Sequence, residues 1–406
     1  MTWALAWRNI FRNKRRTAIT FLAIASGMVA LIVFGGFIEF TFWGLRESTI
    51  HTQIGHIQLH QEGYAERGAA APANYLIENF PSLEALLLNI PHVTVVTARL
   101  TFAGLISTGE QTLTCKATGV LPQSEEELST FETLIAGQPL SQGPPDGGIV
   151  GTELAKALGR KVGDPLTVLT TTLDGTINAT DFQLAGIGQT GSLEYDSVFV
   201  KLPLPMVQRL LNTTKVETVV VLLDETERTP EVAAEIRRVI KDKGLRLELQ
   251  TWDQLAPFYH RVVAMYRGIF QVVRIIIAAI VLFSIANTMT MSVFERVREI
   301  GTLRAVGARR GRILRLFLTE GFLIGAVGGV IGIIAGMAVA LAINYSGGIP
   351  IPPPPGMSRG YIALILLDPW GILSSFVSTV VVATVSAIYP ALRAVRLSVV
   401  EALQHT

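Results

Sequence analysis

Residues that could perform catalysis or hold a metal ion are few in this chain, and their spacing is unfavourable. His51, His56 and His60 are close in sequence, but no thiol or acid at a suitable spacing completes a zinc site. Cys115 is the single cysteine, which rules out an internal disulfide and any multi-thiolate site. The chain lacks the G-x-x-x-x-G-K-[ST] loop that holds the phosphates of ATP. We therefore predict no catalytic, cofactor-binding or metal-binding residues, and no ATP hydrolysis by this chain.

The composition indicates an integral membrane protein with a substantial soluble part. Half of the 406 residues are hydrophobic and only 16% are charged, against about 25% in soluble domains. The mean hydropathy is +0.44. The net charge of +2 gives no basic field that would favour nucleic acid as a partner.

Four stretches are long and apolar enough to cross a bilayer, whose core requires about 20 helical residues. The predicted transmembrane helices are 18–40, 269–293, 313–345 and 369–392. The first is interpreted as a retained helix, because it is long for a signal peptide and three more spans follow it.

The basic residues beside these spans predict their orientation. Residues 1–17 contain five basic residues and no acid, and residues 294–315 contain seven arginines and two acids. Residues 346–368, a proline-rich loop, contain one basic and one acidic residue. Both termini (1–17 and 393–406) and residues 294–312 are therefore expected in the cytoplasm. Residues 41–268 and 346–368 are expected outside.

Residues 41–268 are expected to fold as a large α+β extracytoplasmic domain. They carry 18 basic and 26 acidic residues, a net charge of −8. Alternating and β-branched segments predict strands at 92–102, 111–119, 165–171, 182–186, 197–200, 216–223 and 245–250. The order of elements predicts a small domain, 118–212, inserted between 41–117 and 213–268. The predicted fold class is an α-helical membrane protein with four transmembrane helices and this external domain.

Two cytoplasmic segments are amphipathic. In residues 1–17, Trp3, Trp7, Ile10 and Phe11 fall at helical spacing among arginines, which is typical of a helix lying in the lipid headgroups. In residues 294–312, an apolar residue recurs every three positions from Phe294 to Leu303, and Gly307 allows a break. A passive positive-inside loop needs no such stripe, so this segment is predicted to bind a groove in a partner.

Three features of the later spans could serve packing or binding. Two sets of glycines four residues apart would let helices approach closely, either within the chain or between two protomers: Gly321, Gly325 and Gly329, and Gly328, Gly332 and Gly336. Glu320 is interpreted as a structural hydrogen-bonding residue or as a residue at the membrane interface, with a proton relay as the less favoured alternative. The stretch 349–356 is expected to form a stiff loop that fixes the connection between two spans, with docking of an external partner as the alternative.

The coupling segment "ERVREIGTLRAVGARRGRI" resembles that of the FtsX-like permease family of ABC transporters, which includes MacB-type exporters and lipoprotein-releasing Lol permeases. The opening "LAWRNIFRNKRRTAITFLAIASG" and the tail "YPALRAVRLSVVEAL" also resemble this family. At Ser398 and Val399 many relatives have an acid followed by proline. The resemblance covers essentially the whole chain and is closest in layout to the lipoprotein-releasing permeases.

The resemblance implies a mechanism in which a separate ATPase dimer binds ATP and magnesium and drives motion across the membrane. Residues 41–117 and 213–268 would be a Porter-like subdomain with stalk helices, and 118–212 a Sabre-like insert. Residues expected to contact the ATPase are Ile300 and Leu303 in its groove, with Glu295, Arg296, Glu299 and Arg304 at the rim. A second permease protomer, identical or paralogous, would pair through the first two spans.

The predicted function is therefore a permease subunit that exports or extracts a lipoprotein or another amphiphile at the periplasmic side of a bacterial inner membrane. A periplasmic carrier or adaptor protein and membrane lipids would be further partners. Two alternatives remain: an FtsX-like regulator of an external cell-wall hydrolase, and a MacB-like efflux component working with an adaptor and an outer-membrane channel.

Overall fold

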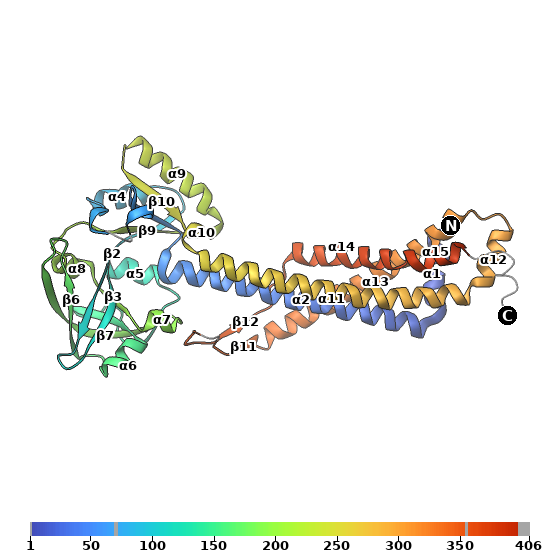
Figure 1. The fold of residues 1–406 in the computed structure, drawn as a ribbon, viewed down its shortest axis with the longest axis horizontal. Coiled ribbons are helices and arrows are strands. Elements are labelled where there is room, and N and C mark those ends of the chain that lie inside the picture. Colours follow the sequence, from blue (N-terminus) through green and yellow to red (C-terminus); the bar gives the residue numbers. More distant parts are fainter. Residues whose placement is uncertain (1, 69–71, 354–355, 397–406) are drawn as a thin grey trace. The chain divides into compact units, whose positions relative to one another are not determined.

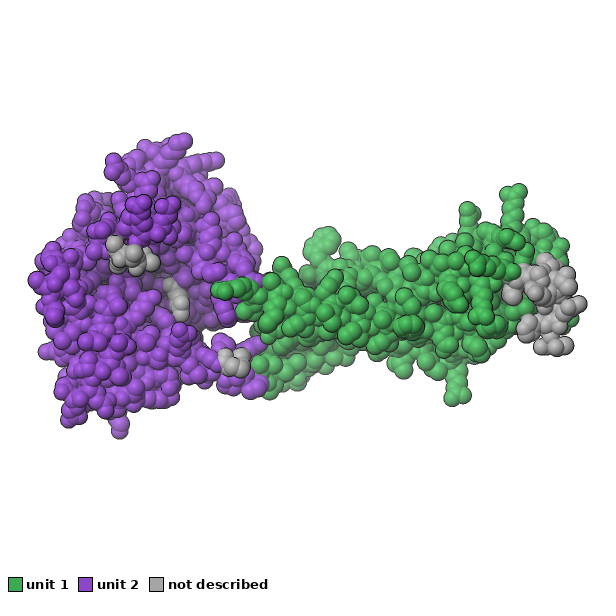
Figure 2. Space-filling model, in the orientation of Figure 1, with its two compact units in different colours: residues 1–43, 261–351, 362–406 green, residues 44–260, 352–361 purple. Residues whose placement is uncertain are grey.

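The computed structural model describes residues 2–68, 72–353 and 356–396. These residues form two compact units (Figure 2). The helical unit comprises the described residues within Met1–Trp43, Arg261–Ile351 and Ile362–Thr406, and the sheet unit comprises those within Gly44–His260 and Pro352–Tyr361.

The helical unit is built from long apolar helices and shorter ones at their polar ends (Figure 1). Its elements are α1 (Thr2–Ile10), most of α2 (Lys14–Thr49) and of α11 (Pro257–Glu295), α12 (Val297–Ala305), α13 (Arg310–Tyr345), β11 (Ile349–Ile351), most of β12 (Tyr361–Ala363), α14 (Pro369–Ser386) and α15 (Ile388–Arg396). Within the described residues, four helical stretches are long and apolar enough to cross a membrane: Lys14–Thr52, Pro257–Glu295, Arg310–Tyr345 and Pro369–Arg396. Each contains one predicted span, so the predicted number of spans is confirmed.

Both glycine stripes of α13 pack against helices of the same chain. A Cβ added at Gly332 would lie 2.5 Å from the Met28 Cβ of α2, and Gly328 and Gly336 face α2 in the same way. A Cβ at Gly325 would lie 2.5 Å from the Ala383 Cβ of α14. The two stripes therefore bring α2 and α14 close to α13. The sequence left open whether these glycines pack within the chain or between two protomers, and in the structure they pack within the chain.

The sheet unit is one mixed sheet with helices packed on it. Its strands are β1 (Ile57–Gln61), β2 (Val93–Ser107), β3 (Thr112–Val120), β4 (Thr133–Gly137), β5 (Gly147–Gly151), β6 (Pro165–Thr171), β7 (Ile177–Gln189), β8 (Phe199–Pro203), β9 (Thr218–Leu223) and β10 (Leu247–Thr251). Their order is β10-β1-β9-β2-β3-β8-β5-β7-β4, with β6 between β2 and β7. Its helices are α3 (Tyr64–Arg67), α4 (Phe80–Leu87), α5 (Pro122–Leu128), α6 (Thr152–Leu158), α7 (Leu193–Asp196), α8 (Leu204–Leu210), α9 (Thr229–Asp242) and α10 (Trp252–Leu255).

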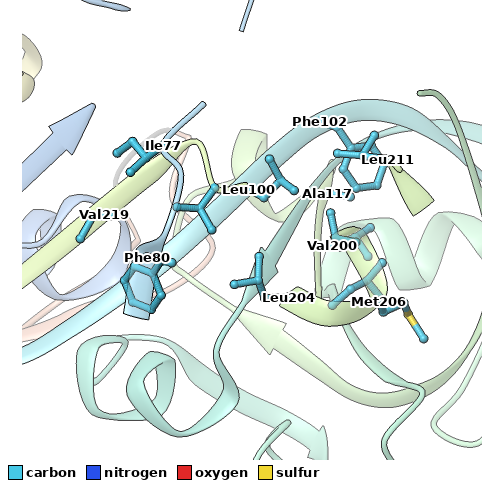
Figure 3. Close-up of a cluster of buried hydrophobic side chains, with 14 of the residues drawn as sticks. Ile77, Phe80, Leu100, Phe102, Ala117, Val200, Leu204, Met206, Leu211 and Val219 are labelled. Carbon is cyan, nitrogen blue, oxygen red and sulfur yellow. The ribbon is translucent and has the colours of Figure 1, made fainter. Parts of the chain in front are cut away.

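Part of this sheet closes on itself. Strands β2, β3, β8, β5, β7 and β6 pair in a circuit that returns to β2. The predicted insert, 118–212, begins inside β3, and its strands close on β2 and β3 of the flanking part. The two parts of the external domain therefore share one sheet and one apolar core (Figure 3).

Strand β2 places its side chains by the two-residue period of a strand. Leu100 and Phe102 face the apolar core (Figure 3), while Arg99 and Thr101 face the opposite, polar side of the sheet. This alternation separates the core from the polar cavity of the sheet unit.

Part of the proline-rich loop is hydrogen-bonded to the sheet unit. The Ser358 N–H donates to the Gly191 carbonyl oxygen at 2.8 Å, and the Gln189 side chain donates to the Ser358 hydroxyl at 2.8 Å. Arg359 donates to the Thr133 hydroxyl at 2.8 Å. Residues 356–359 are thus bound to the chain's own external domain.

Helix packing through Gly332 gives a first prediction. Gly332→Ala should lower the thermal stability of the full chain in detergent by about 1–3 kcal/mol, because the new methyl group would overlap Met28. Gly311→Ala is the matched control, since a Cβ there meets nothing within 4 Å. Equal melting temperatures for the two variants would contradict close packing of α13 on α2.

Candidate functional site

The candidate coupling helix, α12, lies between two breaks in the helical unit. Arg296 leaves the helical conformation at φ −117° and ψ 11°, and α12 begins at Val297. Gly307 has a φ of 94°, in the left-handed region that favours glycine, and α13 begins at Arg310. The break predicted at Gly307 is confirmed.

A buried ion pair anchors the first break. Arg296 is 5% exposed and its Nη1 donates to Glu320 Oε1 of α13 at 2.9 Å. The Asn9 amide of α1 donates to the same oxygen at 2.6 Å. A cavity of about 50 Å³ beside this group has room for water at Arg296 Nη2, which has no protein partner among the described residues. Glu320 is thus a structural acceptor that joins α1, α12 and α13.

Two further ion pairs connect the amino-terminal segment to the same region. Arg16 Nη2 lies 2.8 Å from Glu295 Oε1, and Arg12 pairs with Glu299. Both pairs are partly exposed, and such pairs contribute at most about 1 kcal/mol each. Three of the residues predicted at the rim of a partner's groove, Glu295, Arg296 and Glu299, therefore have partners within the chain.

The role predicted for Ile300 requires correction. Ile300 is 4% exposed and packs in the apolar core of the helical unit, so it is not available to a partner's groove. Leu303 is 50% exposed and Val306 is 84% exposed. A three-residue spacing falls about 60° short of a full helical turn. Successive residues of the predicted stripe therefore rotate around α12, and the exposed apolar tip is formed by Leu303 and Val306.

The carboxy-terminal helix α15 packs on α13 and α14 and also contacts α12 and α11. Arg304 Nη1 donates to the Val395 carbonyl oxygen at 3.4 Å. The Arg393 guanidinium lies 5.3 Å from the centre of the Phe294 ring, a cation–π contact. The tail residues Ser398 and Val399, where the chain differs from the family pattern, lie outside the described residues.

The amino-terminal helix α1 has two distinct faces. Trp3 and Trp7 are about half exposed, whereas Ala6 and Ile10 are buried against the helical unit. The sequence pattern predicted that the tryptophans and Ile10 share one face of this helix. In the structure the tryptophans are on the exposed face and Ile10 is on the buried face. The exposed tryptophans suit the bilayer interface, and the buried face ties the helix to α13.

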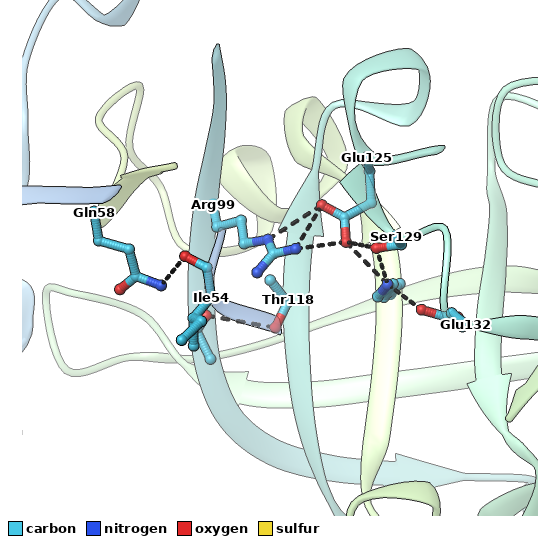
Figure 4. A network of polar contacts seen from close by, with 9 residues as sticks. Ile54, Gln58, Arg99, Thr118, Glu125, Ser129 and Glu132 are labelled. Atoms are coloured by element: carbon cyan, nitrogen blue, oxygen red, sulfur yellow. Dashed lines mark hydrogen bonds and ion pairs between the residues drawn. The ribbon is translucent and has the colours of Figure 1, made fainter. Parts of the chain in front are cut away.

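A second buried polar group holds the sheet unit together (Figure 4). Arg99 of β2 forms paired hydrogen bonds to Glu125 of α5, and Lys201 of β8 lies 2.9 Å from Glu125 and also pairs with Glu132. Burial alone would raise the pKa of Glu125, but the two cations and the Ser129 hydroxyl outweigh it and lower that pKa to about 2. Burial likewise opposes the charge of Lys201, and Glu125 and Glu132 raise its pKa overall. The spacing of these residues in the sequence does not indicate that Arg99, Glu125 and Lys201 form one buried group.

The histidines do not converge on a metal site. The described residues contain no group of three or more His, Cys, Asp and Glu side chains that could hold a metal ion. His56 Nδ1 accepts from the Leu223 N–H at 3.1 Å, and burial lowers the His56 pKa to about 4. The ring of His60 stacks on Tyr64 at 4.2 Å. These histidines have structural partners within the sheet unit.

One catalytic pattern in the sequence is not a nucleophile site. Gly356–Gly360 has the G-x-S-x-G spacing, but Ser358 is in the loop between β11 and β12 rather than in a strand–turn–helix. Its hydroxyl contacts Gln189 and the Asp196 carboxylate instead of a histidine. The only cysteine, Cys115, is buried, and burial raises its pKa to about 12.

Comparison with known proteins covers nearly the whole chain. A family model described as MacB-like periplasmic core domain matches residues 17–239, and one described as FtsX-like permease C-terminal matches residues 272–399. The lipoprotein-releasing system transmembrane protein LolE of Haemophilus influenzae is 23% identical, and the alignment covers 98% of both chains. The macrolide export ATP-binding/permease protein MacB of Nitrobacter winogradskyi is 34% identical over 119 residues, which is 29% of this chain and 16% of that protein.

Solved structures of external domains also match. The periplasmic region of MacB from Actinobacillus actinomycetemcomitans is 14% identical with a TM-score of 0.38, over 51% of this chain and 94% of that one. The extracellular domain of the transporter YknZ from Gram-positive bacteria is 15% identical with a TM-score of 0.36, over 48% of this chain and 99% of that one.

The buried pair at α12 gives a second prediction. Arg296→Met should destabilise the full chain by about 3–5 kcal/mol, because it leaves the Glu320 carboxylate buried without its cation. The double variant Arg296→Met, Glu320→Leu should recover most of that loss, and thermal unfolding in detergent measures both. Arg298→Met, at an exposed position in the first turn of α12, is the control. A double variant as unstable as the single one would mean that the uncompensated charge is not the cause.

Proposed function

We propose that this chain, which belongs to the FtsX-like permease family and carries a MacB-like periplasmic core domain, couples ATP hydrolysis on a separate subunit to extraction of an amphiphile on the other side of the membrane. It is an ABC transporter permease of the LolC/LolE or MacB type. The ATPase would bind ATP and magnesium, and this chain would supply no catalytic group. The alignment with the lipoprotein-releasing relative covers 98% of the chain, so a lipoprotein or similar amphiphile is the favoured cargo.

The exposed tip of α12 is the observation that carries this proposal. Leu303 and Val306 present an apolar surface between charged residues, on a helix whose other face is anchored through Arg296 and Ile300. Interfaces of this kind rely on a few desolvated apolar anchors surrounded by polar groups. A partner that moves α12 would also move α13 and α1, because Glu320 joins all three.

A small pocket lies beside α2 between Leu31 and Phe42. Its volume is about 90 Å³ and it is lined by apolar side chains of α2 and α11, including Phe42 and Phe270. Glu39, Arg267 and Asp368 also line it. This volume is below the range of about 300–1,000 Å³ typical of small-molecule sites, so the pocket can enclose only a short part of an amphiphile.

The proposed assembly contains two permease protomers in a bacterial inner membrane, with both termini cytoplasmic. Helix α11 has large exposed apolar side chains along its length, among them Ile275, Ile280 and Phe283, which can contact lipid or a second protomer. A periplasmic carrier would receive the cargo. The MacB-like alternative, efflux with an adaptor, stays a second candidate because of the periplasmic-core match.

The orientation gives a third prediction. Asp174→Cys, in an exposed turn of the sheet unit, should react with an impermeant thiol reagent in cells whose outer membrane alone is permeabilised. Buried Cys115 should give little background, since its thiol is protonated and shielded. Arg310→Cys should react only after the inner membrane is lysed. The reverse labelling pattern would overturn the topology.

The α12 tip gives a fourth prediction. The double variant Leu303→Glu, Val306→Glu should reduce copurification of the ATPase by more than about tenfold, since loss of apolar anchors typically costs about 2 kcal/mol or more. Membrane abundance should be unchanged because both side chains point away from the core. Ile177→Glu, at an 82% exposed position in the sheet unit, is the matched control.

Normal ATPase binding and normal coupling of hydrolysis in the double variant would refute the assignment of α12 as the coupling helix.

The proposed presence of two permease protomers is tested separately, by measuring the mass of the purified wild-type complex.

A further inference from the structure

The helical unit concentrates positive charge at the end where α1 and α12 lie. Residues 8–16 contain five basic residues and no acid. The acids at this end, among the described residues, each form an ion pair with an arginine: Glu295, Glu299 and Glu320. Lys14 and Arg15 are exposed, and neither has an acidic partner in the described part of the chain. Their charge is therefore available to an anionic partner.

An apolar stripe on the surface of α2 continues directly from Arg15. Ile19 and Leu22 are 59% and 70% exposed. Residues four and seven positions apart lie on one face of a helix, so Arg15, Ile19 and Leu22 form one line along α2. This helix is long and apolar enough to cross a membrane, so acyl chains of lipids cover its exposed apolar side chains. A lipid whose chain lies on this stripe has its head group beside Arg15.

The packing of α13 on α2 fixes which residues of the two helices are level with one another. A Cβ added at Gly328 would lie 3.0 Å from Ile24, and one added at Gly336 would lie 2.8 Å from Ile32. The second contact is the same number of residues farther along both helices. The two helices therefore run parallel to one another in one register.

This register places a tryptophan of α1 beside the start of the stripe. It makes Phe322 level with Ala18, and the Trp3 ring lies edge-on to the Phe322 ring with centroids 5.8 Å apart. Trp3 is 57% exposed, and tryptophan is typical of the boundary between acyl chains and head groups. Arg15 lies about 4–5 Å farther from the apolar stretch of α2, as three residues of helix require. The guanidinium of Arg15 can therefore reach the phosphate groups of the lipids beside Trp3.

We infer that this end of the helical unit binds anionic phospholipid, at a site where Lys14 and Arg15 hold the phosphate of the head group and the apolar stripe contacts an acyl chain. A group of about four to eight basic residues beside a transmembrane helix is typical of proteins that bind anionic lipids. Phosphatidylcholine carries its own ammonium group and offers these two side chains no net charge. The inference requires only that α2 crosses a membrane, so it stands whether or not the transport assignment does.

Quenching of tryptophan fluorescence by brominated lipids tests the site in the full chain. Trp43→Phe and Trp370→Phe remove the other exposed tryptophans of the helical unit. The protein is reconstituted in phosphatidylcholine vesicles that contain brominated phosphatidylglycerol or the same fraction of brominated phosphatidylcholine. Trp3 and Trp7 then report the lipids beside α1, while Trp252, in the sheet unit, adds a constant background. Phosphatidylglycerol should be preferred by at least about fivefold, the effect expected of a single cation at an anionic surface.

Two double variants distinguish a local site from a general attraction to basic residues. Lys14→Gln, Arg15→Gln should reduce the preference to below about twofold, because both cations of the site are lost. Arg309→Gln, Arg310→Gln is the matched control. It removes the same charge from exposed positions, and Arg310 lies about 18 Å before Phe322 along α13. Equal quenching by the two lipids before these substitutions, an unchanged preference in the first variant, or an equal loss in both variants would each overturn the proposal.

Discussion

The arrangement of the helical unit depends on one buried carboxylate. Glu320 is 2% exposed and is the only charged residue of α13 after Arg315, and a charge in such a place is tolerated only with partners. Arg296 and Asn9 provide them at 2.9 and 2.6 Å. Those partners come from the start of α12 and from α1. Because an unpaired buried charge would be costly, these contacts hold α1, α12 and α13 together. A displacement of α12 away from α13 would separate Arg296 from Glu320.

In the external domain too, buried charged side chains join elements that are distant in the sequence. Strand β2 pairs with β9 along its first half, with β3 along its second half and with β6 at its end. It is therefore part of both the closed circuit and the open extension β9-β1-β10. The buried group around Glu125 crosslinks β2, α5 and β8 at that shared strand. The predicted insert is thus held to the rest of the domain by main-chain pairing and by buried charge, while one small apolar cluster, around Leu140, Ile149 and Phe199, lies entirely within it.

Hydropathy and periodicity account for what could be predicted from the sequence. Transmembrane spans, and strands such as 216–223, are predicted from local patterns of residues. The predicted spans correspond to long helices in the structure, and 216–223 corresponds to strand β9. Strand β5, with the sequence GGIVG, was missed because its glycines resemble a loop, although it is a strand buried between β7 and β8. Ile300 was misassigned because periodicity shows that a helix has an apolar face but not which element covers it. The partners of Glu320 are 24 and 311 positions away, and no local pattern reports such pairs.

The connections of the chain decide where motion can enter the external domain. Helix α2 leads into β1 and β10 leads into α11, and β1 and β10 are paired neighbours at one end of the strand order. The loop between α13 and α14 is bound at Gln189 and Asp196, at the end of β7 and in α7, toward the other end of the order. Helices α2 and α11 therefore connect to one end of the strand order, and the loop between α13 and α14 contacts residues toward the other end. Arg99 of β2 and Lys201 of β8, both paired with Glu125 of α5, lie between those two parts in the strand order, so buried ion pairs reinforce the main-chain pairing there.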